Sequence, residues 1–459
     1  MKRIDVLPDE VLLEVFDFYV ERNPPYLNKA GVEAWQSLVH VCRRWRTLVL
    51  GSPRRLNLQL CCRPETPRDR LNIWPALPLL VEGVVCSTSD AGTNNIIATL
   101  GQSDRVRRVF LMDIAGCQLE QVLAAMEVPF PELTDLQLWS CVETPVIPDS
   151  FLGGSSPRLR IFTLYGILFP GLPNLLLSAT HLVELNLHGI PHSWYISPES
   201  IVASLSALSS LRILFLKFRS PQSRSDWESR SPPPLEHSIL PALYKFHFKG
   251  ITEYLEDLVS RIETPQLDEM DIIFFHQIDF DCPQLARFIN RSPILGARDE
   301  AHVQFDDDFA SVELLPQSRA IGIGISCGEP DRQLPSIAQI CNSSFPTLST
   351  IEDLYIKGQH NFPLQAIENS LWLQLLLPFT AVKNLYLSKE LEPGIAAALQ
   401  GLVGARITEV LPSLQKIFVE QLAEPLGSFR KNIRHFAAAR QFSEHPIAIS
   451  LWDIGMKPK

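Results

Sequence analysis

Hydrophobic positions in the first fifty residues follow two helical patterns. In the first pattern the apolar residues are spaced i, i+3, i+4 and i+7, and they are Leu12, Val15, Phe16 and Tyr19. Pro8 suits the first turn of a helix, where its missing N–H group costs nothing, so the helix is predicted to begin at about Pro8. The second pattern covers residues 35–48. So short a stretch buries little core alone, and its apolar surface predicts a partner.

From residue 106 onward the hydrophobic pattern becomes apolar-x-x-apolar-x-apolar. It begins at ten positions: Val106, Leu133, Leu159, Leu182, Leu211, Leu243, Leu267, Ile351, Val382 and Leu414. Successive starts lie 23 to 32 residues apart, except for one gap of 84 residues. Residues 301–305 and 320–325, inside that gap, alternate like strands, so degenerate repeats are predicted there. One strand and one helical or loop return per repeat predict a solenoid, in which each repeat buries its apolar side only against its neighbours.

These patterns divide the chain into four parts. Residues 1–50 form the helical part, and residues 51–105 are interpreted as a connector with one or two strands, one of them at residues 56–60. The solenoid is predicted at residues 106–422, with a mobile loop at residues 220–234 because that stretch is rich in Pro, Ser and charge. The remaining residues, 423–459, are predicted to be a C-terminal cap or tail.

Two short motifs in the helical part carry a resemblance to a known family. Leu7-Pro8 precedes the first helix, and Cys42-Arg43-x-Trp45 lies in the second pattern. Together they resemble an F-box, the helical motif that docks onto Skp-type adaptors of cullin-based ubiquitin ligases. A polar insertion at residues 21–31 loosens the spacing without removing a motif position. The alternative is a generic helical cap on the domain that follows.

The resemblance implies which residues form or support an adaptor interface. By their match to the motif, these are Leu7, Pro8, Leu12, Val15, Phe16, Leu38, Val41, Cys42 and Trp45. Phe16 and Trp45 are also candidates for holding the helices of the motif together.

The repeats resemble leucine-rich repeats, most plainly at residues 133–141. The sequence Leu-Thr-Asp-Leu-Gln-Leu-Trp-Ser-Cys there fits the family pattern Leu-x-x-Leu-x-Leu-x-x-Asn/Cys. The last position varies elsewhere, as at Ile114 and Arg219, so we expect an irregular solenoid. The predicted fold class is α/β, with a short helical F-box segment followed by an irregular leucine-rich-repeat-like solenoid. The alternative is an ordinary doubly wound α/β domain, whose strands usually read as continuous apolar runs.

The strands of such repeats turn alternate residues onto an open face, and this face is aromatic and basic. The positions predicted to bind a substrate are Trp139, Tyr165, Phe215, Lys217, Tyr355, Lys357 and Tyr386. Aromatic side chains are common anchors in protein recognition surfaces. The alternative is that these aromatics pack on one another, on loops or on the C-terminal segment.

The order of an F-box-like segment and a leucine-rich-repeat-like array resembles the substrate receptors of SCF ubiquitin ligases. The resemblance implies a non-catalytic subunit that binds a Skp-type adaptor, and through it a cullin, while the solenoid holds an unknown protein substrate. The alternative is a stand-alone leucine-rich-repeat scaffold for protein interactions, without a ligase role.

Composition narrows the setting in which the protein is expected to work. The formal net charge is −10, from 41 basic and 51 acidic residues, which argues against binding to nucleic acid or to an anionic membrane. Nine cysteines are scattered without a C-x-x-C pair, and their number is odd, as expected for reduced thiols. The N-terminal residues lack the apolar run of a signal peptide. We therefore expect the protein in the cytoplasm or nucleus.

The sequence gives little support for catalysis. It contains no G-x-S-x-G, no G-x-x-x-x-G-K-[ST] and no H-E-x-x-H motif. Gly322 and Gly324 only partly match a dinucleotide fingerprint, and strand alternation explains them better. Three successive acids, at residues 306–308, more often form a solvated turn than a cation site. No catalytic residue, cofactor or metal site is predicted.

Overall fold

The computed structural model describes residues 7–22, 33–66, 70–74, 76–84, 90–112, 116–140, 145–191, 194–221, 237–275, 282–292, 298–315, 320–343, 345, 348–358, 368–402, 404–420, 429–442 and 445–452. The chain divides into two compact units, Met1–Trp194 (unit 1) and Tyr195–Lys459 (unit 2), which are described separately.

Unit 1 begins with three short helices. They are α1 (Asp9–Arg22), α2 (Ala34–Val39) and α3 (Arg43–Gly51). The start of α1 confirms the prediction made from Pro8. The single pattern at residues 35–48 is instead split into two helices, because Cys42 has an extended backbone and caps α3. Its Sγ atom accepts a hydrogen bond from the Trp45 N–H group at 3.5 Å.

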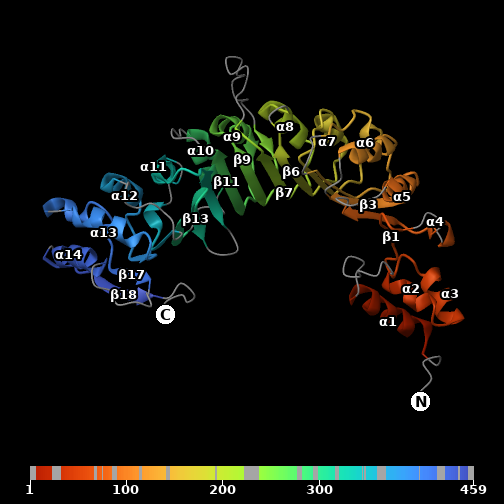
Figure 1. Cartoon of the computed structure of the whole chain (residues 1–459), viewed down its shortest axis with the longest axis horizontal. Coiled ribbons are helices and arrows are strands. Elements are labelled where there is room, and N and C mark those ends of the chain that lie inside the picture. The colour runs from red at the N-terminus through yellow and green to blue at the C-terminus, as the bar shows by residue number, and fades with distance from the viewer. Residues whose placement is uncertain are drawn as a thin grey trace. The chain divides into compact units, whose positions relative to one another are not determined.

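The rest of unit 1 is a parallel sheet with its strands in chain order. The strands are β1 (Leu60–Cys62), β2 (Leu79–Val84), β3 (Val106–Met112), β4 (Asp135–Trp139), β5 (Ile161–Tyr165) and β6 (Glu184–Ile190). The connections hold α4 (Arg70–Ile73), α5 (Asp90–Leu100), α6 (Gly116–Ala125), the 3₁₀ helix η3 (Phe151–Gly154) and α7 (Leu172–Ser178). Figure 1 shows α5, α6 and α7 along one side of this sheet.

Unit 2 continues the strand-and-helix alternation. Its main sheet contains, in spatial order, β7 (Ile213–Phe218), β9 (Lys245–Gly250), β11 (Glu269–Phe275), β14 (Ile321–Ser326), β13 (Phe309–Leu315), β12 (Glu300–Phe305), β15 (Asp353–Gly358), β16 (Asn384–Leu387), β17 (Lys416–Glu420) and β18 (Ala448–Trp452). Two short strands, β8 (Ser238–Ile239) and β10 (Ile262–Glu263), pair separately.

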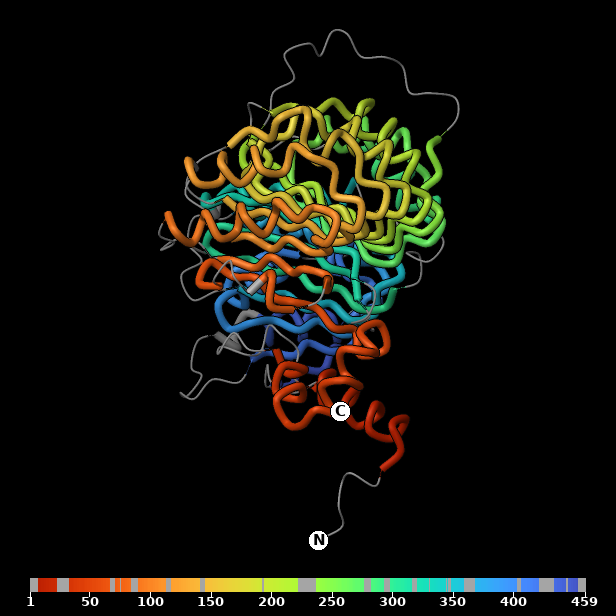
Figure 2. Tube along the Cα trace, turned by 90° about the vertical axis from the view of Figure 1, so that its right-hand side faces the viewer, coloured from red at the N-terminus to blue at the C-terminus, as the bar shows by residue number. Residues whose placement is uncertain are grey.

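The helices of unit 2 lie between its strands in the sequence. They are α8 (Pro198–Leu205), α9 (Thr252–Val259), α10 (Pro283–Arg291), α11 (Pro330–Ser343), η6 (Leu348–Thr350), α12 (Asn369–Leu376), α13 (Glu392–Gln400), η8 (Gly404–Thr408) and α14 (Phe429–Phe442). The Cα trace in Figure 2 follows the chain through these successive coils. A doubly wound domain would carry helices on both faces of its sheet, whereas Figure 1 shows them on one side within each unit.

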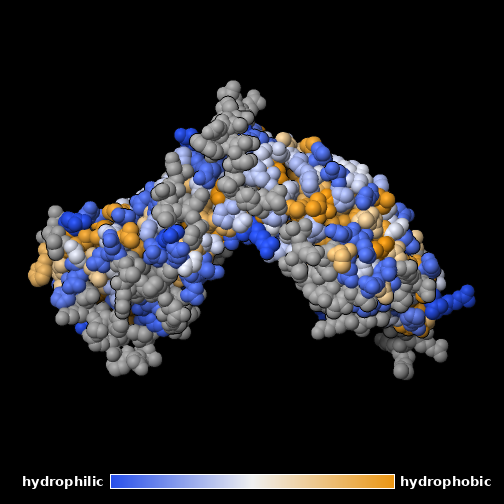
Figure 3. All heavy atoms as spheres, turned by 45° about the horizontal axis from the view of Figure 1, so that its top comes forward, coloured by the Kyte–Doolittle hydropathy of each residue, from blue (hydrophilic) through white to orange (hydrophobic). Residues whose placement is uncertain are grey.

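The apolar triads predicted from the sequence form the core. All thirty side chains are at most 5% exposed, and those of Leu133, Leu136 and Leu138 in β4 and the turn before it are completely buried. Apolar side chains that remain exposed are mostly dispersed, and Figure 3 shows hydrophobic patches separated by hydrophilic ones. The triads therefore confirm a repeat array with one apolar strand face per repeat.

The gap between residues 267 and 351 does not hold regular repeats. The predicted strands at residues 301–305 and 320–325 are present as β12 and β14, but a third strand, β13, lies between them and is antiparallel to both. The reason is a tight turn at the three acids, where the Asp306 N–H group donates to the Phe309 carbonyl at 2.7 Å and reverses the chain. The parallel order resumes where β12 pairs with β15.

The array also extends beyond its predicted ends. The connector at residues 51–105 contributes β1 and β2 to the sheet. Residues 56–60, predicted as a strand, start in a turn, and β1 begins only at Leu60. At the other end, α14 and β18 add another helix and parallel strand in place of a simple cap or tail. Most of the predicted loop at 220–234 lies outside the described residues, as does Cys141.

Candidate protein-interaction surfaces

Helix α1 carries apolar residues on two sides. One side buries Leu12, Leu13 and Phe16 among the three N-terminal helices, and the ring centroids of Phe16 and Trp45 lie 4.7 Å apart. The other side leaves an apolar strip in solvent, made of Leu7, Val11, Val15 and Phe18 and here called the α1 strip. Contiguous exposed apolar residues of this kind mark binding surfaces in soluble proteins.

The structure separates the predicted adaptor residues into two groups. Leu12, Phe16 and Leu38 are buried, so they hold the helices together. The exposed members of the set are Leu7, Pro8, Val15 and Val41, and those that are half-buried are Cys42 and Trp45. Val11 and Phe18 extend the exposed group but were not predicted from the sequence. Val11, Val15 and Phe18 are spaced i, i+4 and i+7, and this helical spacing could have identified them.

Polar contacts also link the three helices to each other and to the sheet of unit 1. The Arg44 guanidinium binds the Asp9 carboxylate at 2.5 Å and the Leu7 carbonyl at 2.6 Å, which fastens α3 to the start of α1. The Trp35 indole N–H group donates to the Gln59 carbonyl at 2.9 Å. The Glu33 carboxylate accepts a hydrogen bond from the backbone of Cys61 at 2.7 Å. The α1 strip is therefore presented on a supported element.

On the open strand face of unit 1, aromatic rings stack at the strand ends. Trp139 and Tyr165 are register partners, and their rings are parallel within 5° with centroids 5.2 Å apart. His188 continues the stack on the next strand at 6.2 Å. Two predicted substrate residues are thus brought together in an aromatic stack made of Trp139, Tyr165 and His188, in which Tyr165 is 36% exposed.

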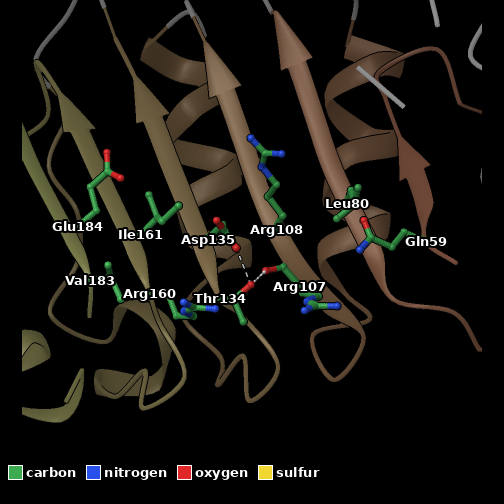
Figure 4. A pocket seen from close by; sticks show the side chains of 10 residues that line it. All are labelled: Gln59, Leu80, Arg107, Arg108, Thr134, Asp135, Arg160, Ile161, Val183 and Glu184. Carbon is green, nitrogen blue, oxygen red and sulfur yellow. Dashed lines mark hydrogen bonds between the residues drawn. The ribbon is translucent and has the colours of Figure 1, made fainter. Parts of the chain in front are cut away.

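A pocket of about 380 Å³ lies at the other end of the same strands. Its lining residues, drawn in Figure 4, are Gln59, Leu80, Arg107, Arg108, Thr134, Asp135, Arg160, Ile161, Val183 and Glu184. The pocket was not predicted. Arg108 sits two positions before Phe110 on the strand face, so alternation could have placed it there. That it has no ionic partner among the described residues depends on the fold.

In unit 2 the strand face carries a second group of rings and cations. Phe215 and His247 are register partners whose rings stack at 4.2 Å, and the Lys217 ammonium lies 5.3 Å from the Phe215 centroid. The His247 Nδ1 atom is 3.0 Å from the Asp271 carboxylate, which orients the ring. The predicted pair Phe215 and Lys217 is therefore brought together on a half-buried surface.

Tyr355 and Tyr386 do not form the open surface that was predicted. Each is only 6% exposed, and their rings stack at 4.1 Å. Phe418 stacks on Tyr386 at 4.5 Å, and Trp452 from β18 packs edgewise against both tyrosines. Burial raises the pKa of both tyrosine hydroxyls. The alternative interpretation, packing on one another and on the C-terminal segment, holds for these two residues.

Lys357 lies beside this buried group. Its ammonium is 5.8 Å from the Tyr355 ring centroid and half-buried. Across the neighbouring strands, Glu313 has a raised pKa, first because of burial and then because of the nearby Asp271 carboxylate, while Lys357 acts in the opposite direction. Within the part of the chain that the structure describes, no group of three or more His, Cys, Asp or Glu residues could hold a metal ion.

The fold places the chain in the class of mixed α/β repeat proteins with a long, mainly parallel sheet. No protein-family model matches the sequence, and no curated protein matches it. Among solved structures, the chain is similar to the leucine-rich repeat-containing protein LegL7 from Legionella pneumophila. The identity is 12%, the match covers 83% of this chain and 97% of the other, and the TM-score is 0.28. Among the described helices, none has the length and apolar character needed to cross a membrane.

Proposed function

We propose that this chain is a substrate receptor of an SCF-type ubiquitin ligase. The three N-terminal helices, with their F-box-like motifs, bind a Skp-type adaptor and through it a cullin, and the repeat array binds a protein substrate. The observation that carries the proposal is the α1 strip, because a helix that already buries one apolar side within its own unit has a second apolar side in solvent.

The mechanism is one of proximity. The chain itself performs no chemistry, and a separate enzyme transfers ubiquitin to the substrate held on the strand face. Ion pairs such as that of Arg44 with Asp9 are exposed and contribute only about 0–1 kcal/mol each, so the apolar packing around Phe16 sets the position of α1. The described cysteines are free thiols, which supports a reducing compartment, the cytoplasm or nucleus.

Substitution of Val15 tests the proposal directly. Val15 is 51% exposed on α1, so Val15→Asp leaves the core intact but places a charge in the α1 strip. We expect co-purification with a Skp-type adaptor to fall at least tenfold, since burying an unpaired carboxylate at an apolar interface costs more than about 1.4 kcal/mol. The matched control is Leu177→Asp, because Leu177 is 54% exposed on the helix α7 outside this surface.

The two variants together test whether the α1 strip binds the adaptor. Loss with Val15→Asp and retention with Leu177→Asp support the adaptor interface. Equal adaptor capture by both variants and the unaltered chain, or no capture by any of them, would contradict it.

The second candidate function is a stand-alone protein-interaction scaffold. The strand faces of both units favour it independently of α1, because they carry accessible rings and cations such as the exposed Tyr165 and the half-buried Lys217. A chain that binds a partner protein through these faces, and no Skp-type adaptor, would have this function instead.

A further inference from the structure

Three arginine side chains in the unit 1 pocket have no ionic partner among the residues that the structure describes. In Figure 4, Arg107 and Arg160 lie on either side of Thr134 at the strand starts, and Arg108 extends along its own strand. Within the described residues, no ion pair joins any of the three to a carboxylate. By contrast, Arg158, only two residues from Arg160, pairs with Glu132 at 2.5 Å.

The two carboxylates of the pocket are already bound by neutral groups. Asp135 accepts a hydrogen bond from the Thr134 hydroxyl at 2.5 Å, and Glu184 accepts one from the Asn186 amide at 2.7 Å. Three guanidinium groups against two carboxylates leave the lining positive in a chain whose net charge is −10. Guanidinium groups bind carboxylates with paired hydrogen bonds, so the pocket favours an acidic group.

The pocket and the aromatic stack share one strand face. Asp135 and Trp139 belong to β4, and Ile161 and Tyr165 belong to β5, four residues apart in each case. At about 3.3 Å per residue the two sites are separated by roughly 13 Å along the strands. An extended peptide covers that distance in about four residues, and residues four apart in such a peptide point the same way.

Polar groups occupy the surface between the two sites. The middle positions in register are Gln137, Thr163 and Asn186. Asn186 is 7% exposed and donates to Thr163 at 3.0 Å, while its Oδ1 atom has no hydrogen-bond partner among the described residues. A buried amide oxygen without a partner is unusual in folded proteins.

We propose that the strand face of unit 1 binds an extended segment of the substrate protein that has an acidic side chain and, four residues away, an aromatic one. The acidic side chain binds Arg107, Arg108 and Arg160, and the aromatic ring continues the stack of Trp139 and Tyr165. The inference rests on the proposed substrate-receptor function and specifies what the receptor recognises.

A displayed library of random peptides, selected against the purified full-length chain, tests this inference. We expect enrichment of an Asp or Glu four residues from a Trp, Tyr or Phe. Synthetic peptides of the enriched sequence should lose at least tenfold in affinity when the acid is replaced by its amide, or when the spacing is shortened from four residues to three. Binding should weaken as salt is raised.

Protein variants locate the site. Arg160→Ala and Tyr165→Ala change exposed side chains and should each weaken binding at least tenfold, whereas the neighbouring Arg158→Ala should leave it unchanged. Arg160→Glu should shift the selected residue from acidic to basic, a result that misfolding cannot mimic. Enrichment without an acid, a requirement for phosphate in place of a carboxylate, preference for nucleic acid, or equal binding by the Arg158 and Arg160 variants would overturn the inference.

The readout separates this inference from the proposed function. Val15→Asp should bind the selected peptide normally, because the α1 strip is not part of this face. If the chain binds the peptide but not the adaptor, the inference is supported and the proposed ligase role is contradicted. If the chain binds the adaptor but no acidic peptide is enriched, the inference about the peptide is wrong and the proposed ligase role still stands.

Discussion

At the scale of single residues, burial decides which aromatic positions can meet a partner. Tyr165 is open on its strand, whereas Tyr355 and Tyr386 are covered by a group that includes Trp452. The alternating pattern places all three on the same kind of face, but Trp452 is 66 residues beyond Tyr386 in the sequence. Local alternation could therefore predict the face of these residues and not their exposure.

The unpaired arginines illustrate the same limit. Arg158 and Arg160 are separated by one residue, yet among the described residues only Arg158 has an acidic partner, which lies 26 residues earlier. Ion pairs between repeats depend on how the turns of neighbouring repeats, which differ in length, lie beside each other. The sequence alone does not show this arrangement. This is why the pocket was not predicted while its strands were.

Glu392 supplies a prediction at this scale. Burial raises the pKa of its carboxyl group from 4.5 to about 7. The folded chain therefore keeps a proton that the unfolded chain releases, and the free energy of unfolding falls as the pH rises from 4.5 to 7. Glu392→Gln should remove this loss and stabilise the protein at pH 8 by roughly 1–3 kcal/mol.

Urea denaturation between pH 4.5 and pH 8 measures the effect. The gain from Glu392→Gln should be largest above pH 7 and disappear towards pH 4.5. Glu409→Gln, at an exposed position, is the control and should not change the pH profile apart from its weak surface pairing with Arg406. A pH-independent difference between the Glu392 variant and the unaltered chain would be inconsistent with this account.

At the scale of elements, most of the array could be predicted because each repeat buries the same three apolar positions. Leu133, Leu136 and Leu138 are buried against the equivalent residues of neighbouring repeats, so the pattern can be recognised within a few residues of sequence. The antiparallel strand β13 was not predicted, since it depends on the turn at Asp306 pairing two strands that parallel repeats would keep apart. The split between α2 and α3 was missed because Cys42 also fits the helical spacing.

The attachment of α14 gives a prediction for one element. Arg440 is completely buried, and it donates to the Ile407 carbonyl at 3.1 Å and the Leu411 carbonyl at 2.9 Å. Burial lowers its pKa. Arg440→Met leaves both carbonyls without their donor and should destabilise the chain by about 2–4 kcal/mol.

Chemical denaturation and amide hydrogen exchange check this prediction. Exchange should increase first in α14 and β18, which the arginine ties to the rest of unit 2. Arg434→Met, on the exposed side of the same helix, should be nearly neutral. If the two substitutions had equal effects, the buried contacts of Arg440 would not be holding α14 in place.

At the scale of the whole molecule, we propose a separate surface for each partner. The α1 strip faces the proposed adaptor, and the strand face of unit 1 faces the proposed substrate. The sequence could predict part of each surface, since residue spacing identifies apolar positions such as Val15 and aromatic positions such as Trp139. It could not predict which positions remain exposed, because that depends on packing between helices and between repeats.

Calorimetry with the purified chain and a purified Skp-type adaptor measures binding at the proposed interface itself. We expect a one-to-one complex that forms with the unaltered chain and with Leu177→Asp. Val15→Asp should weaken it at least tenfold, because a charge would be buried at the interface. No detectable complex with the unaltered chain, or an equally strong one with Val15→Asp, would contradict the proposal.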